Sequence, residues 1–169
     1  MQFSETALSP RERLGRIKTR MREVAESELA TYALYHHISC RSSHHATPAL
    51  ARLSQTAQIE DMDHYWLMQS GIRRLGGVEP IPDDTLVGLL EDSDLRRTAL
   101  REILRLLRDA EARLVHGYQE ICALAMEFDY QIFDLAFRNM QENALHQASL
   151  ESILRGSQIP AEPQRPRDR

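Results

Sequence analysis

The chain carries the same pattern of potential metal ligands twice. In the first copy Glu28 is followed seven residues later by Tyr35 and 36 residues later by His64, with Asp61 three residues before that histidine. Each copy places a lone Glu on one segment and an acid–x–x–His-like pair on the next. The second copy keeps this order at nearly the same spacing and consists of Glu111, Tyr118, Asn143 and His146.

This repeat limits the folds that the chain can adopt. Residues three or four apart lie on one face of a helix, so Asp61 and His64 can grip one metal ion together. Four helices in two antiparallel pairs would bring both copies into one buried, carboxylate-rich cavity, as a two-metal site requires. The second copy departs from the pattern, because Asn143 stands where an acid is expected.

The composition favours an all-α chain. A length of 169 residues corresponds to about one domain, and no stretch alternates with a period of two for long enough to predict a sheet. No apolar run approaches the roughly 20 residues that span a bilayer, and residues 1–10 contain no apolar stretch typical of a secretory signal. The two cysteines lack metal-like spacing, which predicts reduced thiols in a cytoplasmic protein with no membrane association.

Local start and stop signals place four long helices. Ser9-Pro10 and Thr47-Pro48 each combine an N-cap residue with Pro at the first helical position. The first helix should run to about Ser39, and Gly76-Gly77 should end the second. The third helix should begin at Ser93 or Asp94 and reach about Glu127, and Asp129 should cap the fourth.

These helices predict one domain with a simple topology. Short connections within each pair and one long crossover, residues 78–92, give an up-down-down-up four-helix bundle over residues 1–155. Residues 9–22 form a basic N-terminal part of the first helix. The Pro-, Arg- and Gln-rich residues 156–169 are expected to form a disordered tail.

Four stretches resemble the bacterioferritins and the bacterioferritin-like Dps proteins. They are the segment from Glu28 to His36, the segment from Ile59 to His64, the Leu-Gly-Gly close at residues 75–80, and Glu111 with Tyr118 on the third helix. The resemblance covers about residues 20–155. It implies a ferritin-like four-helix bundle, a dinuclear iron site with ferroxidase activity and, in many members, a hollow cage of subunits.

The resemblance implies a set of metal ligands in which two of the residues remain undecided. The expected ligands are Glu28, Asp61, His64, Glu111 and His146, a carboxylate and imidazole set that suits iron and also manganese. Asn143 cannot supply an anion, so Glu142, four residues before His146, is the expected sixth ligand. Glu60 has the same relation to His64, which leaves Glu60 with Glu142 as an alternative to Asp61 with Asn143.

Two further residues carry specific expectations. Tyr35 is the candidate catalytic residue, either as a hydrogen-bond donor to the metal carboxylates or as an electron donor. Its alternative role is that of a core tyrosine with a satisfied hydroxyl. Met62 stands where bacterioferritins carry the Met that binds haem between two subunits, so the resemblance implies a site for haem b. The alternative is a Met that fills a subunit contact.

The sequence thus predicts an iron-handling protein that oxidises Fe(II) with O2 or peroxide for storage or detoxification. One alternative is a metal-poor scaffold that acts through protein contacts. Another is a Dps-like assembly that protects DNA. The chain is also expected to form a homo-oligomer, either a dimer or a cage. The DNA hypothesis depends on a basic run in which Glu12 is the sole acid, although such runs are commonly solvated faces. The run consists of Arg11, Arg13, Arg16, Lys18, Arg20 and Arg22.

Overall fold

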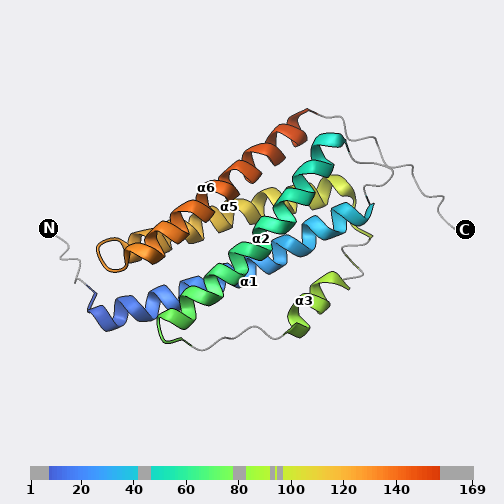
Figure 1. Cartoon of the computed structure of the whole chain (residues 1–169). Coiled ribbons are helices and arrows are strands. Elements are labelled where there is room, and N and C mark those ends of the chain that lie inside the picture. Colours follow the sequence, from blue (N-terminus) through green and yellow to red (C-terminus); the bar gives the residue numbers. More distant parts are fainter. Residues whose placement is uncertain (1–7, 42–46, 78–82, 92–93, 95–96, 157–169) are drawn as a thin grey trace, which may run out of the picture.

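The computed structural model describes residues 8–41, 47–77, 83–91, 94 and 97–156, and this part of the chain contains helices but no strand. The helices whose bounds the described residues define are four long ones and one short one (Figure 1). They are α1 (Pro10–Arg41), α2 (Pro48–Arg74), α3 (Asp83–Leu90), α5 (Leu100–Ala125) and α6 (Tyr130–Arg155). The expected tail and the expected start at Ser93 lie outside the described residues.

The long helices form the predicted up-down-down-up bundle. In Figure 1, α1 and α2 run side by side in opposite directions, as do α5 and α6, while α2 and α5 point the same way. The connection from α2 to α5 therefore returns along the whole length of the bundle. Its helix α3 packs against α1, where His37 Nε2 lies 3.3 Å from the carbonyl oxygen of Leu89.

The first two helices begin where their capping residues predict. Ser9 Oγ accepts a hydrogen bond from the backbone N–H of Glu12 at 3.3 Å, and Glu12 Oε2 accepts one from the backbone N–H of Ser9 at 2.9 Å. This reciprocal pair is a capping box. Thr47 Oγ1 accepts from the backbone N–H of Leu50 at 3.3 Å, and Pro48 occupies the first turn.

The second pair of helices agrees with the sequence only at α6. Asp129 Oδ1 accepts from the backbone N–H of Ile132 at 3.1 Å, so the predicted cap is confirmed. The predicted start of the third helix at Asp94 is wrong for α5, which begins at Leu100. Its N-cap residue, Ala99, makes no side-chain hydrogen bond, so the chain offers no local capping signal there.

The Gly-Gly pair ends α2 as predicted. Gly76 has a φ of +69°, the left-handed conformation that glycine adopts without steric cost. The N–H of Gly77 donates to the carbonyl of Ile72 at 2.9 Å, and that of Gly76 donates to Arg73 at 2.9 Å. These bonds satisfy carbonyl groups that the end of a helix leaves free.

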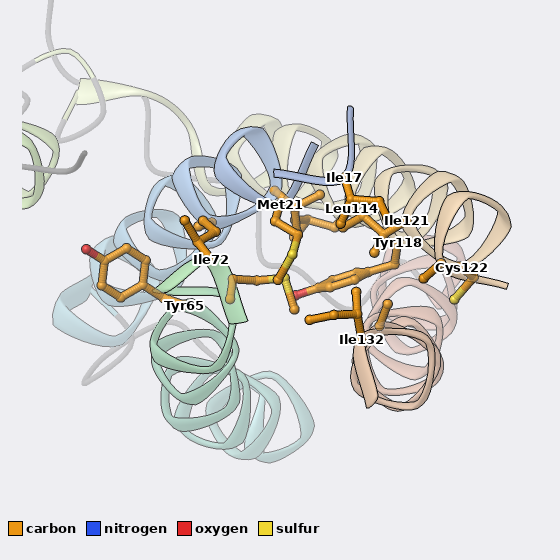
Figure 2. Packing of buried hydrophobic residues seen from close by; sticks show 14 of the residues in the cluster. Ile17, Met21, Tyr65, Ile72, Leu114, Tyr118, Ile121, Cys122 and Ile132 are labelled. Atoms are coloured by element: carbon orange, nitrogen blue, oxygen red, sulfur yellow. The ribbon is translucent and has the colours of Figure 1, made fainter. Parts of the chain in front are cut away.

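Two hydrophobic clusters fill the bundle and leave a polar zone between them. One cluster gathers around Met21, Ile72, Tyr118 and Ile132 from all four long helices (Figure 2). The other gathers around Tyr35 and further apolar residues of the same four helices, namely Ile38, Leu50, Ala57, Leu100, Ile103, Leu104, Leu107 and Leu150. The polar residues of the repeat lie between the clusters, held by packed helices on every side.

Candidate metal centre

The structure brings the two copies of the repeat together in the middle of the bundle. Glu28 comes from α1, Asp61 and His64 from α2, Glu111 from α5 and His146 from α6. We call these five residues the central cluster. Its three carboxylates are fully buried, and the two histidines are 2% and 4% exposed. Ionisable groups are rarely buried to this extent unless they pair with other charges or bind metal.

The central cluster forms two groups of potential ligands that share one residue. Glu28, Asp61 and His64 place one ligand atom each within 4.8 Å of one another, and so do Asp61, Glu111 and His146. Asp61 belongs to both groups. A carboxylate with two oxygens in this position can contact two cations at once, which is the geometry of a dinuclear site.

Several polar atoms of this region have no hydrogen-bond partner. Buried unpaired donors and acceptors are costly, so a set concentrated in one place indicates a missing ligand. A pair of divalent cations would satisfy the carboxylate oxygens and the imidazole nitrogens together. The orphaned atoms are Glu28 Oε2, Asp61 Oδ1 and Oδ2, His64 Nδ1, Glu111 Oε2, Asn143 Oδ1 and His146 Nδ1.

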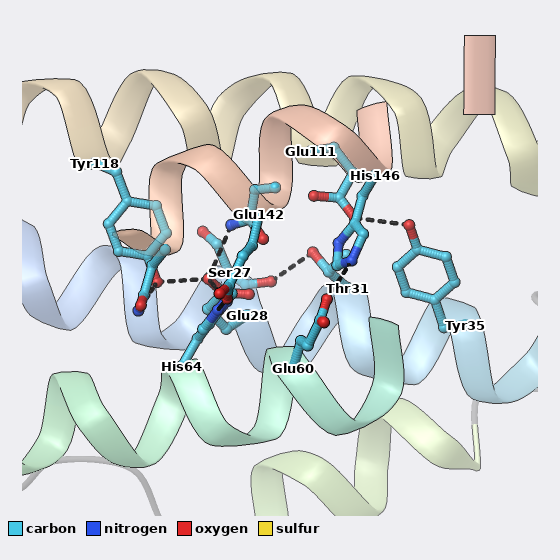
Figure 3. A network of polar contacts seen from close by, with 12 residues as sticks. Ser27, Glu28, Thr31, Tyr35, Glu60, His64, Glu111, Tyr118, Glu142 and His146 are labelled. Carbon is cyan, nitrogen blue, oxygen red and sulfur yellow. Dashed lines mark hydrogen bonds and ion pairs between the residues drawn. The ribbon is translucent and has the colours of Figure 1, made fainter. Parts of the chain in front are cut away.

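Two tyrosines each donate a hydrogen bond to the glutamate of the opposite helix, α1 or α5. The hydroxyl of Tyr35 donates to Glu111 Oε1 at 2.7 Å, and that of Tyr118 donates to Glu28 Oε1 at 2.6 Å (Figure 3). Burial, reinforced by the charge of Glu111, raises the pKa of Tyr35 well above its usual range. Burial and the charge of Glu28 do the same for the pKa of Tyr118. Both hydroxyls therefore stay protonated and act as donors.

Each histidine is oriented by a glutamate on its solvent side. His64 Nε2 bonds to Glu142 Oε2 at 2.6 Å, and His146 Nε2 bonds to Glu60 Oε2 at 2.6 Å (Figure 3). A histidine that donates through Nε2 keeps its Nδ1 lone pair for a metal. Nδ1 of His64 lies 3.2 Å from Glu28 Oε1, inside the cluster.

The pKa values of the cluster reflect the crowding of its charges. Burial raises the pKa of Asp61 well above its usual range, and the charges of Glu28 and Glu111 raise it further. Burial also raises the pKa of Glu111, and it outweighs the neighbouring imidazole of His146, which lowers it. Three buried carboxylates close together repel one another, so the site favours positive charge from protons or from cations.

The pKa values of the two histidines are raised as well. Burial alone would lower the pKa of His64, but hydrogen bonds and charges of Glu28 and Glu142 outweigh it and raise the pKa. For His146, burial is likewise outweighed by Glu111 and Glu60. Without a metal, the surrounding carboxylates therefore favour the protonated form of both imidazoles.

The two sequence-based ligand sets lie in different surroundings. Asp61 lies at the centre, whereas Glu60 and Glu142 are 34% and 47% exposed at their side chains and lie outside both ligand groups. Glu142, the expected sixth ligand, contacts the outer nitrogen of His64 instead. Asn143 occupies the buried position and donates through Nδ2 to Glu28 Oε1 at 3.1 Å.

One functional neighbour was not singled out from the sequence. Asn139 lies one turn before Asn143 on α6 and donates through Nδ2 to the hydroxyl of Tyr118 at 3.2 Å. A buried amide one helical turn from a predicted ligand position is the signal that could have identified it. Met62 is partly buried and packs against the cluster around Met21, apart from both ligand groups.

A groove leads from the surface toward the centre between α2 and α6. It has a volume of about 510 Å³ and is lined by Glu60, Glu142 and His146 together with residues such as Arg52 and Leu145. The carboxylates that orient the histidines are thus also the polar lining of this groove. Among the described helices, none is long and apolar enough to cross a bilayer.

Comparisons with known proteins agree with this fold. The chain is 27% identical over 137 residues to the DNA protection during starvation protein of Pyrococcus furiosus, an alignment that covers 79% of this chain and 74% of the relative. The Desulfovibrio desulfuricans bacterioferritin, whose structure contains a diiron site, superimposes with a TM-score of 0.68 at 20% identity over 88% of this chain and 84% of that one. A dodecameric thioferritin of Bacteroides fragilis gives a TM-score of 0.64 at 18% identity, over 83% of this chain and 86% of that one. The sequence profile of the ferritin-like domain matches residues 20–158, and the chain belongs to the ferritin-like family.

Proposed function

We propose that this protein is a ferroxidase that binds two Fe(II) ions in the central cluster and oxidises them. The observation that carries this proposal is the set of carboxylate oxygens and imidazole nitrogens that gather without hydrogen bonds at the buried centre of the bundle. Hard oxygen ligands with two imidazoles suit iron, and they also accept manganese. Other ferritin-like bundles perform other chemistry, so the site and not the fold supports the proposal.

The electrons balance with an oxidant from solution. Two Fe(II) ions release two electrons, which reduce one O2 with two protons to H2O2, or one H2O2 with two protons to two waters. Iron is the substrate, and the product is Fe(III) for storage or detoxification. Asp61 would contact both ions, with Glu28 and His64 holding one and Glu111 and His146 holding the other.

The surrounding residues position these ligands. The hydroxyl of Tyr35 fixes Glu111, and that of Tyr118 fixes Glu28, so neither carboxylate has to reorganise when an ion arrives. Glu60 and Glu142 direct Nδ1 of the histidines inward. Tyr35 is our candidate catalytic residue because its oxygen lies 2.7 Å from a carboxylate of the cluster.

The test is rapid mixing of anaerobically Fe(II)-loaded protein with O2, followed by ferric absorbance. Glu28→Ala and His64→Ala should abolish the fast phase, because each removes a ligand. Asp63→Asn is the matched control, since Asp63 is an exposed acid next to His64 and outside both ligand groups. Unchanged rates in both Ala variants would refute the assignment. A fast phase lost in the control as well would point to a general effect of charge.

The metal-poor scaffold remains the competing hypothesis, and Asn143 is its basis. It predicts no bound iron after anaerobic Fe(II) loading and no change in stability on adding a chelator. The orphaned atoms argue against it, because a bundle that never bound metal would keep five buried oxygens without a hydrogen bond for no gain. Elemental analysis of the loaded, desalted protein decides between the two.

DNA binding is a second candidate function, favoured by a basic groove. Arg101, Arg105, Arg108 and Arg155 line a groove of about 430 Å³ between α5 and α6, accompanied by Asp109 and Glu151. The relative from Pyrococcus furiosus is named for DNA protection. The basic run of α1 is the alternative surface. Its Arg20 pairs with Glu23 at 2.7 Å and with Glu120, and three of the groove arginines pair likewise with Glu102, Asp109 and Glu151.

Two matched double variants separate these surfaces. R101Q/R105Q removes two charges from the α5 groove, and R11Q/R13Q removes two from the start of α1. If the groove binds DNA phosphates, the first variant alone should weaken DNA retardation and reduce the salt slope by about two counterions. Weakening by the second variant alone would locate binding on α1, as the sequence predicts, and no retardation in the parent protein would refute DNA binding.

The proposal also covers the oligomeric state and a haem-binding site. We propose a homo-oligomer, a dimer or a cage, in the cytoplasm, and a haem b site at Met62 if two copies meet along α2. Mass determination in solution tests the first point. Haem reconstitution with Met62→Leu as the control tests the second, because a bound haem should lose its thioether absorbance signature in that variant.

A further inference from the structure

The two halves of the central cluster are not equivalent, and the difference lies in amides on α6. The repeat pairs Asp61 of α2 with Asn143 of α6. It also pairs Ala57, seven residues before His64, with Asn139, seven residues before His146. The half that contains Glu28 is therefore surrounded by amide groups that the other half lacks.

These amides form a chain of hydrogen bonds that ends on Glu28. Asn139 donates to the hydroxyl of Tyr118 at 3.2 Å, and this hydroxyl donates to Glu28 Oε1 at 2.6 Å. Asn143 Nδ2 donates to the same oxygen at 3.1 Å. Glu28 Oε1 thus has two hydrogen-bond donors, and His64 Nδ1 lies 3.2 Å from it.

The corresponding oxygen of Glu111 has a simpler environment. It accepts from the hydroxyl of Tyr35 at 2.7 Å and lies 3.3 Å from His146 Nδ1. In the described part of the chain, no amide bonds to it. A cation beside Glu111 therefore competes with fewer donors than one beside Glu28.

The chemistry of an amide adds to this difference. A carboxylate has two oxygens and can contact both cations, but an amide has one oxygen and one NH2 group. Because the NH2 of Asn143 donates to Glu28, it faces the half-site of Glu28 and cannot ligate there. Its single oxygen, which is buried and unpaired, is free to serve at most the other half-site.

We propose that the central cluster loads its two cations in a fixed order that Asn143 sets. The first divalent cation binds tightly at Asp61, Glu111 and His146. The second binds more weakly at Glu28, Asp61 and His64. Partners of metal ligands change affinity by about 10- to 100-fold, which is the difference expected between the two steps. This inference rests on the proposed dinuclear site and adds the order of loading and the residue that determines it.

The test is an anaerobic titration of the full chain with Co(II), followed by its visible absorption bands and by calorimetry. The parent protein should bind two equivalents in two resolved steps. Glu28→Gln should keep the tight step and lose the weak one, whereas Glu111→Gln should lose the tight step. Asn143→Asp should tighten the second step about 10- to 100-fold, so that both equivalents bind almost together.

Several results of this titration would contradict the proposal. Two indistinguishable steps in the parent protein, loss of the tight step in Glu28→Gln, or an unchanged second step in a helical Asn143→Asp protein would each overturn the fixed order. If the buried charge of Asn143→Asp prevents folding, the comparison of the two Gln variants decides alone. Absence of Co(II) binding in every protein would refute the dinuclear site itself, whereas two equal steps would refute only the order.

Discussion

Tyr35 of α1 donates its hydrogen bond to Glu111 of α5, and not to Glu28 on its own helix, at an oxygen–oxygen distance of 2.7 Å. The repeat-related bond from Tyr118 of α5 to Glu28 of α1 has a length of 2.6 Å. Each half of the repeat therefore fixes a ligand of the other half. The equal spacing from Glu to Tyr in the two copies follows from this exchange between α1 and α5.

Removal of this hydroxyl should weaken the metal-free protein. In Tyr35→Phe the buried carboxylate of Glu111 loses a donor, which should lower the free energy of unfolding by about 1–3 kcal/mol. Tyr32→Phe is the control, because Tyr32 is only partly buried and its ring stacks on His36. Urea unfolding of both proteins in chelator measures the difference, and equal losses would mean that the bond to Glu111 contributes nothing specific.

Asp61 should lower the stability of the metal-free protein while enabling metal binding. Asp61→Asn keeps the shape but removes a carboxylate whose two oxygens are unpaired and whose pKa burial raises. We expect the metal-free variant to be more stable by about 1–4 kcal/mol, the range by which replacing a buried ion pair with uncharged residues can stabilise a protein. It should also lose the stabilisation that saturating metal gives the parent, about 2.7 kcal/mol at 100 times Kd.

Thermal unfolding with and without Mn(II) tests both parts of this prediction. Asp63→Asn should change neither value, because Asp63 is exposed. A destabilised Asp61→Asn protein in chelator would show that Asp61 has a structural partner, contrary to the unpaired state of its oxygens.

The stability of the metal-free protein should fall as the pH rises through neutrality. The pKa values of His64 and His146 are raised above their usual 6.5, although burial alone would lower them, because carboxylates surround both rings. A raised pKa in the folded state stabilises fully below pH 6.5, and this contribution is lost as the pH rises through the folded value. The raised pKa of Asp61 acts in the same direction.

Metal should reverse this dependence, because cations bind the deprotonated ligands and release the protons. Unfolding temperatures at pH 6 and pH 8, with chelator or with Mn(II), provide the comparison. The chelated protein should be more stable at pH 6 and the loaded protein should gain most at pH 8. The double variant H64Q/H146Q should flatten the chelated profile, and an unchanged profile would place the titrating groups elsewhere.

Two glycines should respond oppositely to alanine. A Cβ on Gly117 of α5 would lie 2.7 Å from Val24 Cγ2 of α1, so Gly117→Ala should cost about 1–3 kcal/mol through overpacking. Gly15 is helical with nothing within 4 Å of its Cβ position, so Gly15→Ala should stabilise by about 0.5–1 kcal/mol. Urea unfolding measures both changes, and a neutral Gly117→Ala would mean that α1 and α5 separate at little cost.

The sequence predicted most of the fold because most helix boundaries are local. Ser9, Thr47, Asp129 and the Gly-Gly pair act on residues within one turn, so their side chains identify the ends of helices without knowledge of the rest of the chain. The start of α5 is different. Ala99 has no capping side chain, and the helix begins where Leu100 is buried in the core, which depends on distant partners.

The sequence left open which side chain of α6 faces the candidate site. Glu142 and Asn143 precede His146 by four and three residues, and both spacings keep a pair on one face. The rotation of α6 about its axis decides which of them is buried, and packing against the other helices sets that rotation. It buries Asn143 and turns Glu142 outward, where it meets His64.

Two partly exposed carboxylates lie between the buried histidines and the solvent. Glu60 and Glu142 contact the outer nitrogens of His146 and His64, whose inner nitrogens face the central cluster. Protons displaced by arriving cations can therefore leave along an imidazole and one carboxylate, with no helix moved aside. Each buried imidazole is thus separated from bulk solvent by a single, partly exposed carboxylate.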